Sequence, residues 1–202
     1  MKYKLTKNTK EWPGKTLFQI EATASFGSVT KGEMGGYIEK ESNLSQDGDA
    51  WVSGNARVYG NALVYGNAWV SGDALVYGNA RVYGNALVYG NALVYGNARV
   101  YGDAWVYGDA WVYGDAWVSG NARVYGNARV YGKFKLTLGY FFGGRYKKEE
   151  IKYLKIDDEY EVIYKGEAKI EAYNDEERTE ATTTEQEAIS LLKKNGYKII
   201  KE

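Results

Sequence analysis

The chain has 202 residues with 26 basic and 26 acidic side chains, so it has no net charge that could attract a polyanion or an anionic membrane over its whole surface. It contains neither cysteine nor histidine, which excludes disulfides, thiolate and imidazole metal sites, and histidine general bases. No segment approaches the roughly 20 apolar residues of a membrane span, and none resembles a signal peptide. We therefore expect a cytoplasmic protein with no membrane or nucleic-acid partner.

Residues 1–35 lack any repeat and are predicted to form an N-terminal cap. Within them, residues 17–22 alternate apolar and polar side chains, which favours a strand. An uncovered solenoid end presents unpaired backbone groups and an apolar cross-section, so a cap is expected at this position.

A six-residue repeat fills the middle of the chain. From Gly48 to Tyr131 the unit Gly-(Asn/Asp)-Ala-x-Val-(Tyr/Ser) occurs fourteen times without a break. Side chains alternate along a strand, so Ala and Val of each unit point into one narrow interior, while Gly with Asn or Asp is typical of a corner. Three units close a coil of 18 residues, which predicts a parallel β-helix of about five coils over residues 36–132. In its degenerate first coil, Ile38 and Leu44 are expected to take the place of Ala.

After Gly132 the composition changes to Lys, Glu, Ile and Tyr, which predicts a boundary near residue 133 and a small α+β module over residues 133–202. Gly143 and Gly144 are interpreted as a two-residue hairpin turn, since this explains them better than a phosphate cradle with Arg145. A capping box at residues 184–187 opens an amphipathic helix that ends near Asn195. The strand-like stretches are residues 134–142, 145–156, 160–164, 169–173 and 197–200.

The repeat, seen for example as Val-Tyr-Gly-Asn-Ala-Leu at residues 58–63, resembles the hexapeptide repeat of left-handed parallel β-helices. Residues 31–45, leading into the array, resemble hexapeptide-repeat proteins encoded by phages and prophages. The resemblance covers residues 17–131 and implies an all-β solenoid with left-handed, triangular coils. It also implies a homotrimer, because members of this group commonly trimerise through their walls.

The best-known enzymes of the left-handed β-helix group that this repeat resembles are acyltransferases, which use a histidine as general base. Carbonic-anhydrase-like members of the group bind zinc through histidines. Since this chain has no histidine, we expect no acyl transfer, no metal and no cofactor. The carboxylates of the array occupy the corner slot that Asn fills elsewhere, and turn chemistry explains them better than catalysis. They are Asp49, Asp73, Asp103, Asp109 and Asp115.

The outer slot between Ala and Val holds Trp, Leu or Arg, and the tyrosine slot after Val holds Tyr or Ser. Sorting the outer slots by 18 predicts three columns, one for each wall. The first wall has Trp51, Trp69, Leu87, Trp105 and Arg123; the second has Arg57, Leu75, Leu93, Trp111 and Arg129; the third has Leu63, Arg81, Arg99 and Trp117. Trp, Tyr and Arg dominate the hot spots of protein interfaces, so the column of Trp51, Trp69, Leu87 and Trp105 is the candidate oligomer interface. Ser53 and Ser71 are expected to leave Trp51 and Trp69 more open.

Arg81 and Arg99 are predicted to lie one coil apart on the third wall. An anion could bridge the two guanidinium groups, and Tyr83 and Tyr101 could offer a stacking surface for a base. These four residues are the candidate site for a phosphorylated aromatic small molecule at a protomer boundary.

Three classes of function remain open from the sequence. The leading hypothesis is a noncatalytic structural or binding module, associated with a phage, that presents protein- or ligand-binding surfaces on a rigid oligomeric β-helix. The alternative is a phage counter-defence protein that sequesters a nucleotide-like molecule between protomers. An acyltransferase-like enzyme is the third and least favoured class, because the histidine is missing.

Overall fold

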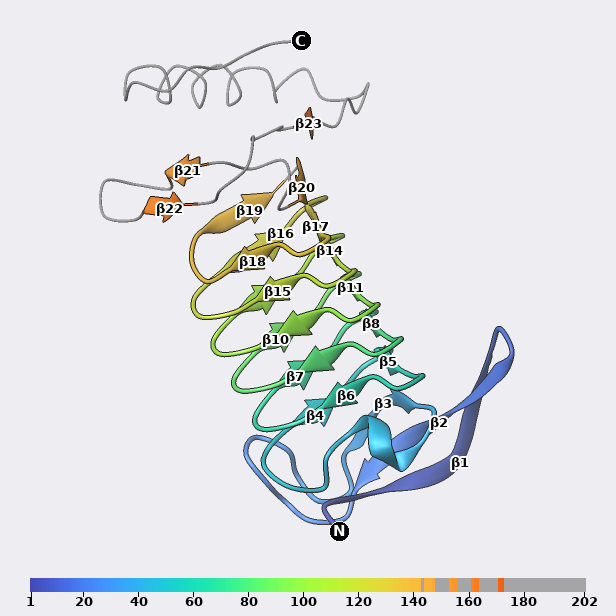
Figure 1. Cartoon of the computed structure of the whole chain (residues 1–202). Coiled ribbons are helices and arrows are strands. Elements are labelled where there is room, and N and C mark those ends of the chain that lie inside the picture. Colours follow the sequence, from blue (N-terminus) through green and yellow to red (C-terminus); the bar gives the residue numbers. More distant parts are fainter. Residues whose placement is uncertain (143, 148–152, 156–160, 164–170, 173–202) are drawn as a thin grey trace.

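The computed structural model describes residues 1–142, 144–147, 153–155, 161–163 and 171–172. These residues form a parallel β-solenoid of about six turns, with an N-terminal hairpin that projects from its base (Figure 1). The only helical element within this described part is the short 3-10 helix η1 (Glu41–Asn43). The expected all-β solenoid is therefore confirmed.

Three parallel sheets form the walls, and each turn contributes one short strand to each sheet. The first wall contains β4 (Trp51–Val52), β7 (Trp69–Val70), β10 (Leu87–Val88), β13 (Trp105–Val106), β16 (Arg123–Tyr125) and β19 (Tyr140–Phe142). The second wall contains β3 (Met34–Ile38), β5 (Arg57–Val58), β8 (Leu75–Val76), β11 (Leu93–Val94), β14 (Trp111–Val112), β17 (Arg129–Tyr131) and β20 (Gly144–Lys147). The third wall contains β6 (Leu63–Val64), β9 (Arg81–Val82), β12 (Arg99–Val100), β15 (Trp117–Val118) and β18 (Lys135–Leu136).

The Ala and Val residues of the repeat line the interior, and nearly all of them are fully buried. Side chains alternate between the two faces of an extended chain, and Ala and Val of each unit lie two positions apart. Both side chains therefore point into the interior. The corner glycines have positive φ, as Gly84 does at 70°, and an added Cβ at Gly84 would lie 2.9 Å from the backbone nitrogen of Gly102. Glycine is thus required both for the left-handed backbone and for the close approach of successive coils.

Asn and Asp at the corners act through their side chains. No non-glycine residue in the described part has a positive φ, so only glycine takes the left-handed conformation at these corners. Instead the amides form ladders along the axis: Asn61 donates to Asn79, Asn79 to Asn97, and Asn97 to Asp115. A carboxylate fits the last position of such a ladder, because it accepts hydrogen bonds and has none to donate.

The N-terminal cap extends the second wall. Strands β1 (Tyr3–Trp12) and β2 (Lys15–Ala22) form an antiparallel hairpin, and β2 pairs with β3, which starts the parallel stack by pairing with β5. The strand expected at residues 17–22 is confirmed within β2, whereas β1 was not anticipated.

The first coil is longer than the later ones. Ile38 pairs with Val58 and Leu44 with Val64, a separation of 20 residues, whereas Val52 pairs with Val70 at a separation of 18. Ile38 and Leu44 therefore take the place of Val, and the expectation that they replace Ala is wrong. The two extra residues lie between Leu44 and Val52, after η1, because these two inward residues are eight positions apart and their partners Val64 and Val70 are six apart.

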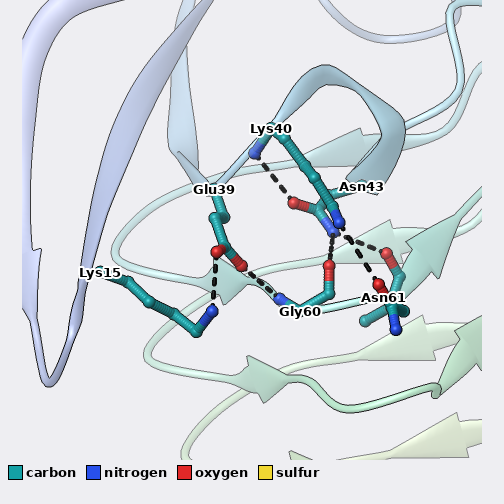
Figure 2. A network of polar contacts seen from close by, with 7 residues as sticks. Lys15, Glu39, Lys40, Asn43, Gly60 and Asn61 are labelled. Carbon is teal, nitrogen blue, oxygen red and sulfur yellow. Dashed lines mark hydrogen bonds and ion pairs between the residues drawn. The ribbon is translucent and has the colours of Figure 1, made fainter.

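Side chains of the irregular first coil satisfy the backbone of the first regular coil (Figure 2). The buried Asn43 amide donates to Gly60 O at 3.1 Å and Ala62 O at 2.8 Å, while its Oδ1 accepts from Lys40 N. Glu39 accepts hydrogen bonds from Gly60 N and from Lys15 Nζ. Burial alone would raise the pKa of Glu39, but these two donors hold it below its ordinary value.

Residues beyond Gly132 continue the solenoid, so a boundary near residue 133 does not coincide with its end. Strands β18, β19 and β20 pair in parallel with β15, β16 and β17, and Phe134, Leu136 and Phe141 join the core. The solenoid therefore has about six turns rather than five. Larger apolar side chains replace Ala and Val here, which keeps the interior filled while the repeat pattern disappears.

The expected hairpin at Gly143 and Gly144 is wrong, because β19 lies in the first wall and β20 in the second. Beyond β20, the described strands are β21 (Tyr153–Lys155), which pairs with β22 (Glu161–Ile163), and β23 (Glu171–Ala172), which pairs with β20. The expected helix after residue 184 and the strand at residues 197–200 lie outside the described residues.

Candidate functional site

The three columns of outer-slot residues are confirmed by the strand register. On the first wall Trp51 pairs with Trp69, Trp69 with Leu87, Leu87 with Trp105, and Trp105 with Arg123. The second and third walls likewise follow the expected order, and Lys135 adds a fifth member to the third column.

Trp51 does not belong to the outer surface. Its side chain is fully buried, with edge contacts to Tyr3 and Phe26 of the cap at ring-centroid distances of 6.4 Å and 5.5 Å. The expectation that Ser53 leaves Trp51 open is therefore wrong, because the cap folds over the first strand of this wall. Trp51 is therefore not accessible to a partner on the first wall. Its contacts hold the cap on the solenoid.

The rest of the first wall forms a continuous apolar surface. Trp69, Leu87 and Trp105 are half-buried, and Trp69 Nε1 donates to Ser53 Oγ at 3.1 Å. The Arg123 guanidinium lies 4.0 Å from the Trp105 ring centroid and donates to Asp103 O, so it is held against the wall. At the C-terminal end of this wall Tyr140 is 68% exposed and Phe142 is 52% exposed. This wall thus combines half-buried and exposed aromatic side chains.

The tyrosine slots form stacked ladders along all three walls. On the second wall Tyr59, Tyr77, Tyr95, Tyr113 and Tyr131 stack at centroid distances of 4.9–5.1 Å. The first wall has Tyr89, Tyr107, Tyr125 and Phe142, and the third has Tyr65, Tyr83 and Tyr101. Burial and neighbouring phenols raise the pKa of Tyr77 and Tyr83. These ladders stabilise the walls and direct ring edges toward solvent.

The candidate ligand site is only partly assembled in the expected way. Arg81 and Arg99 are direct cross-strand partners, as expected. Tyr83, however, stacks on Tyr65 at 4.7 Å and on Tyr101 at 4.8 Å, with nearly parallel ring planes. Both faces of the Tyr83 ring are occupied, so the expected stacking of a ligand base on it is wrong.

Above these arginines, the Trp117 ring lies between two cations. The Arg99 guanidinium is 4.6 Å and the Lys135 ammonium 4.2 Å from its centroid. Arg81 is exposed and takes part in none of the ion pairs or cation–π contacts found within the described residues. The third wall therefore presents three cations over four consecutive strands.

The sequence interpretation missed a belt formed by one complete coil. Trp105, Trp111 and Trp117 lie on the three walls of the same turn, and the next turn places Arg123, Arg129 and Lys135 over their rings at 4.0–4.3 Å. Asp103, Asp109 and Asp115 occupy the corners of this turn. Three consecutive Gly-Asp-Ala-Trp units followed by Gly-Asn-Ala-Arg units were the available signal. Such cation–π contacts stabilise each wall by roughly 0.5–1 kcal/mol at exposed positions.

The carboxylates of this belt have structural partners. Asp103, Asp109 and Asp115 each accept an amide hydrogen bond at 2.9 Å from the Asn one coil earlier. Among the residues that the structure describes, no group of three potential ligands could hold a metal ion, and no helix is long and apolar enough to cross a membrane. The carboxylates therefore serve the corners, as the sequence indicates.

Fold and walls together define a parallel β-solenoid repeat protein. Six segments of the array are similar to a family model described as the YdcK beta solenoid repeat: residues 50–66, 56–72, 74–90, 80–96, 92–108 and 122–134. A comparison with curated proteins found no significant match. The repeat solenoid is thus supported, while the left-handed coil and the resemblance to phage-encoded members stay predictions.

Proposed function

We propose that this chain is a noncatalytic scaffold whose rigid solenoid self-associates, as a homotrimer, through the first wall and leaves other surfaces available for a partner. The observation that carries the proposal is the continuous surface of Trp69, Leu87 and Trp105, with exposed Tyr140 and Phe142 beyond Arg123 at the C-terminal end of the same wall. Contiguous apolar surfaces of this kind on soluble proteins commonly mark interaction sites.

The first wall is favoured over the second for a geometric reason. Trp12 of the projecting hairpin lies beside the N-terminal end of the second wall, with its ring 4.2 Å from the Arg57 guanidinium and 6.4 Å from Tyr59. A flat partner would therefore meet the hairpin there. The first wall carries one cation, Arg123, which is already held by Trp105 and by backbone carbonyls.

A noncatalytic role fits the chemistry of the array. Without histidine or cysteine, carboxylates are its natural candidates for a general base, and those of the belt are engaged in corner ladders. A base needs hydrogen-bond reach to a substrate, and these groups lie on convex corners. Sequestration of a nucleotide is less favoured, because the ring faces of the central tyrosines stack on one another.

Sedimentation velocity at micromolar concentration tests the proposal. We expect a trimer for the wild type and dissociation in the Trp69→Glu, Trp105→Glu double variant, because each buried carboxylate would lose its solvation without a partner. The matched control, Leu75→Glu with Leu93→Glu on the second wall, should keep the trimer. Since Trp69 also packs against the core, Leu87→Glu is a milder second variant with the same expected result. A monomeric wild type, or a trimer in both first-wall variants, would contradict the proposal.

A further inference from the structure

The third wall carries three cations in its outer slots, whereas the first wall carries one. Arg81 and Arg99 are direct neighbours in adjacent parallel strands, and Lys135 follows on the far side of Trp117. None of the outer slots of this wall holds an acidic residue. Like charges opposite each other in a sheet are destabilising, so this arrangement has a cost that the fold alone does not explain.

The charges of the third wall are only partly compensated. Two carboxylates lie at corners that flank this wall, Asp103 one coil and Asp115 two coils beyond the coil of Arg81, and they accept hydrogen bonds from Asn85 and Asn97. Arg99 is held by the Trp117 ring. This contact orders the guanidinium group but does not neutralise its charge. Arg81 is exposed and forms no ion pair with any described residue.

The spacing and the aromatic geometry restrict the ligand. Strands β9 and β18 are separated by three strand spacings, about 14 Å, which exceeds the reach of one small anion. Bases and sugar rings bind by stacking on aromatic faces, but Tyr83 has both faces covered by other tyrosines. The tyrosine edges, with their hydroxyl groups, remain as hydrogen-bond donors beside the cations. A linear ligand with repeated anionic groups fits this surface better than a nucleotide whose base would stack on Tyr83.

We propose that the third wall is a docking strip for an extended acidic polypeptide segment of a partner protein, with carboxylates received by Arg81, Arg99 and Lys135. In an extended chain alternate side chains lie on one face about 6.8 Å apart, so three acidic residues span the same 14 Å. Arginine pairs with carboxylates in a bidentate manner, which favours the two guanidinium groups as the main contacts. The proposal rests on the proposed function, since self-association through the first wall leaves this strip accessible.

Fluorescence anisotropy with a labelled heptapeptide of alternating glutamate and threonine tests the strip on the full chain at low salt. We expect binding that weakens with salt, and that is about tenfold weaker in the Arg81→Gln, Arg99→Gln double variant. The single Arg81→Gln variant changes only an exposed side chain and should show part of this loss. The matched control, Lys7→Gln with Lys31→Gln, removes the same charge from exposed cap positions and should bind within about twofold of the wild type.

Three results would overturn the docking strip. The first is no binding up to about 1 mM peptide, and the second is an equal loss of peptide affinity in the arginine and lysine variants. The third is Arg81-dependent binding of an oligothymidine of equal charge that is tighter than the binding of the peptide. Sedimentation of the same samples separates the two proposals. A monomeric wild type that still binds the peptide through Arg81 would contradict only the proposed trimer. A trimeric wild type that does not bind the peptide would contradict only the proposed docking strip.

Discussion

The side-chain amide of Asn43 donates a hydrogen bond of 2.8 Å to the carbonyl oxygen of Ala62, where a preceding regular coil would otherwise supply a backbone N–H group. Asn43 is fully buried, and its second donated bond goes to Gly60 O. A polar side chain thus replaces part of the missing sheet edge at the start of the third wall.

Asn43→Ala should lower the free energy of unfolding by about 2–4 kcal/mol, because it leaves two carbonyl groups and one backbone N–H without partners. Thermal unfolding followed by circular dichroism measures the effect. Ser42→Ala, at an exposed neighbouring position, is the control and should change little. If Asn43→Ala has the same melting temperature as the wild type, water replaces the amide and the proposed capping role of Asn43 is wrong.

Lys2 should make stability depend on pH. Its Nζ donates to Gly48 O and Ala50 O, and burial lowers its pKa from 10.5 to about 8, against the opposing effect of Asp49 and Asp47. Between these values the unfolded chain holds a proton that the folded chain has lost, so the free energy of unfolding should rise with pH, by at most about 1.4 kcal/mol per unit. Guanidinium unfolding of the wild type and of Lys2→Met between pH 7.5 and about 9.5 measures this slope.

The upper limit of that pH range follows from Tyr3. Burial raises the pKa of Tyr3 above its ordinary value of 10, so its contribution to stability is present below pH 10 and is lost as pH rises further. Identical pH slopes for the wild type and Lys2→Met below pH 9.5 would show that Lys2 is not the titrating group.

Two glycines with nearly the same φ should respond differently to substitution by alanine. Gly84 and Gly14 have φ of 70° and 71°, but an added Cβ at Gly84 meets Gly102 N at 2.9 Å, while nothing lies within 4 Å of one at Gly14. Gly14→Ala should cost about 1 kcal/mol from backbone strain alone, and Gly84→Ala about 1–3 kcal/mol more from the steric clash between coils. Denaturation midpoints of the two variants measure the difference. Equal losses of unfolding free energy in the two variants would mean that neighbouring coils separate easily to accommodate the added methyl group.

No turnover of acetyl-coenzyme A with amine or alcohol acceptors is expected, because the chain has no histidine to act as the base. A thiol-release assay with purified protein checks this. Turnover that a single substitution in this chain abolishes would contradict the proposed noncatalytic role.

Much of the solenoid could be predicted from the sequence because its interactions repeat locally. The direction of Ala80 and Val82 depends only on strand alternation, and the pairing of Arg81 with Arg99 follows once a coil has 18 residues. The three columns and the buried interior were therefore predictable without any contact between distant segments. The structural role of the corner carboxylates followed from their place in the same unit.

Only the tertiary structure decided which of those side chains are accessible. Trp51 and Trp69 share the local segment Ala-Trp-Val-Ser-Gly, yet the cap buries Trp51 against Tyr3 and Phe26. Tyr83 loses both ring faces to tyrosines 18 residues away in either direction, and Phe134 and Phe141 continue the core after the repeat has ended. Each of these results depends on segments that are distant in sequence and adjacent in space, whereas the periodic pattern describes only what a residue does within its own coil.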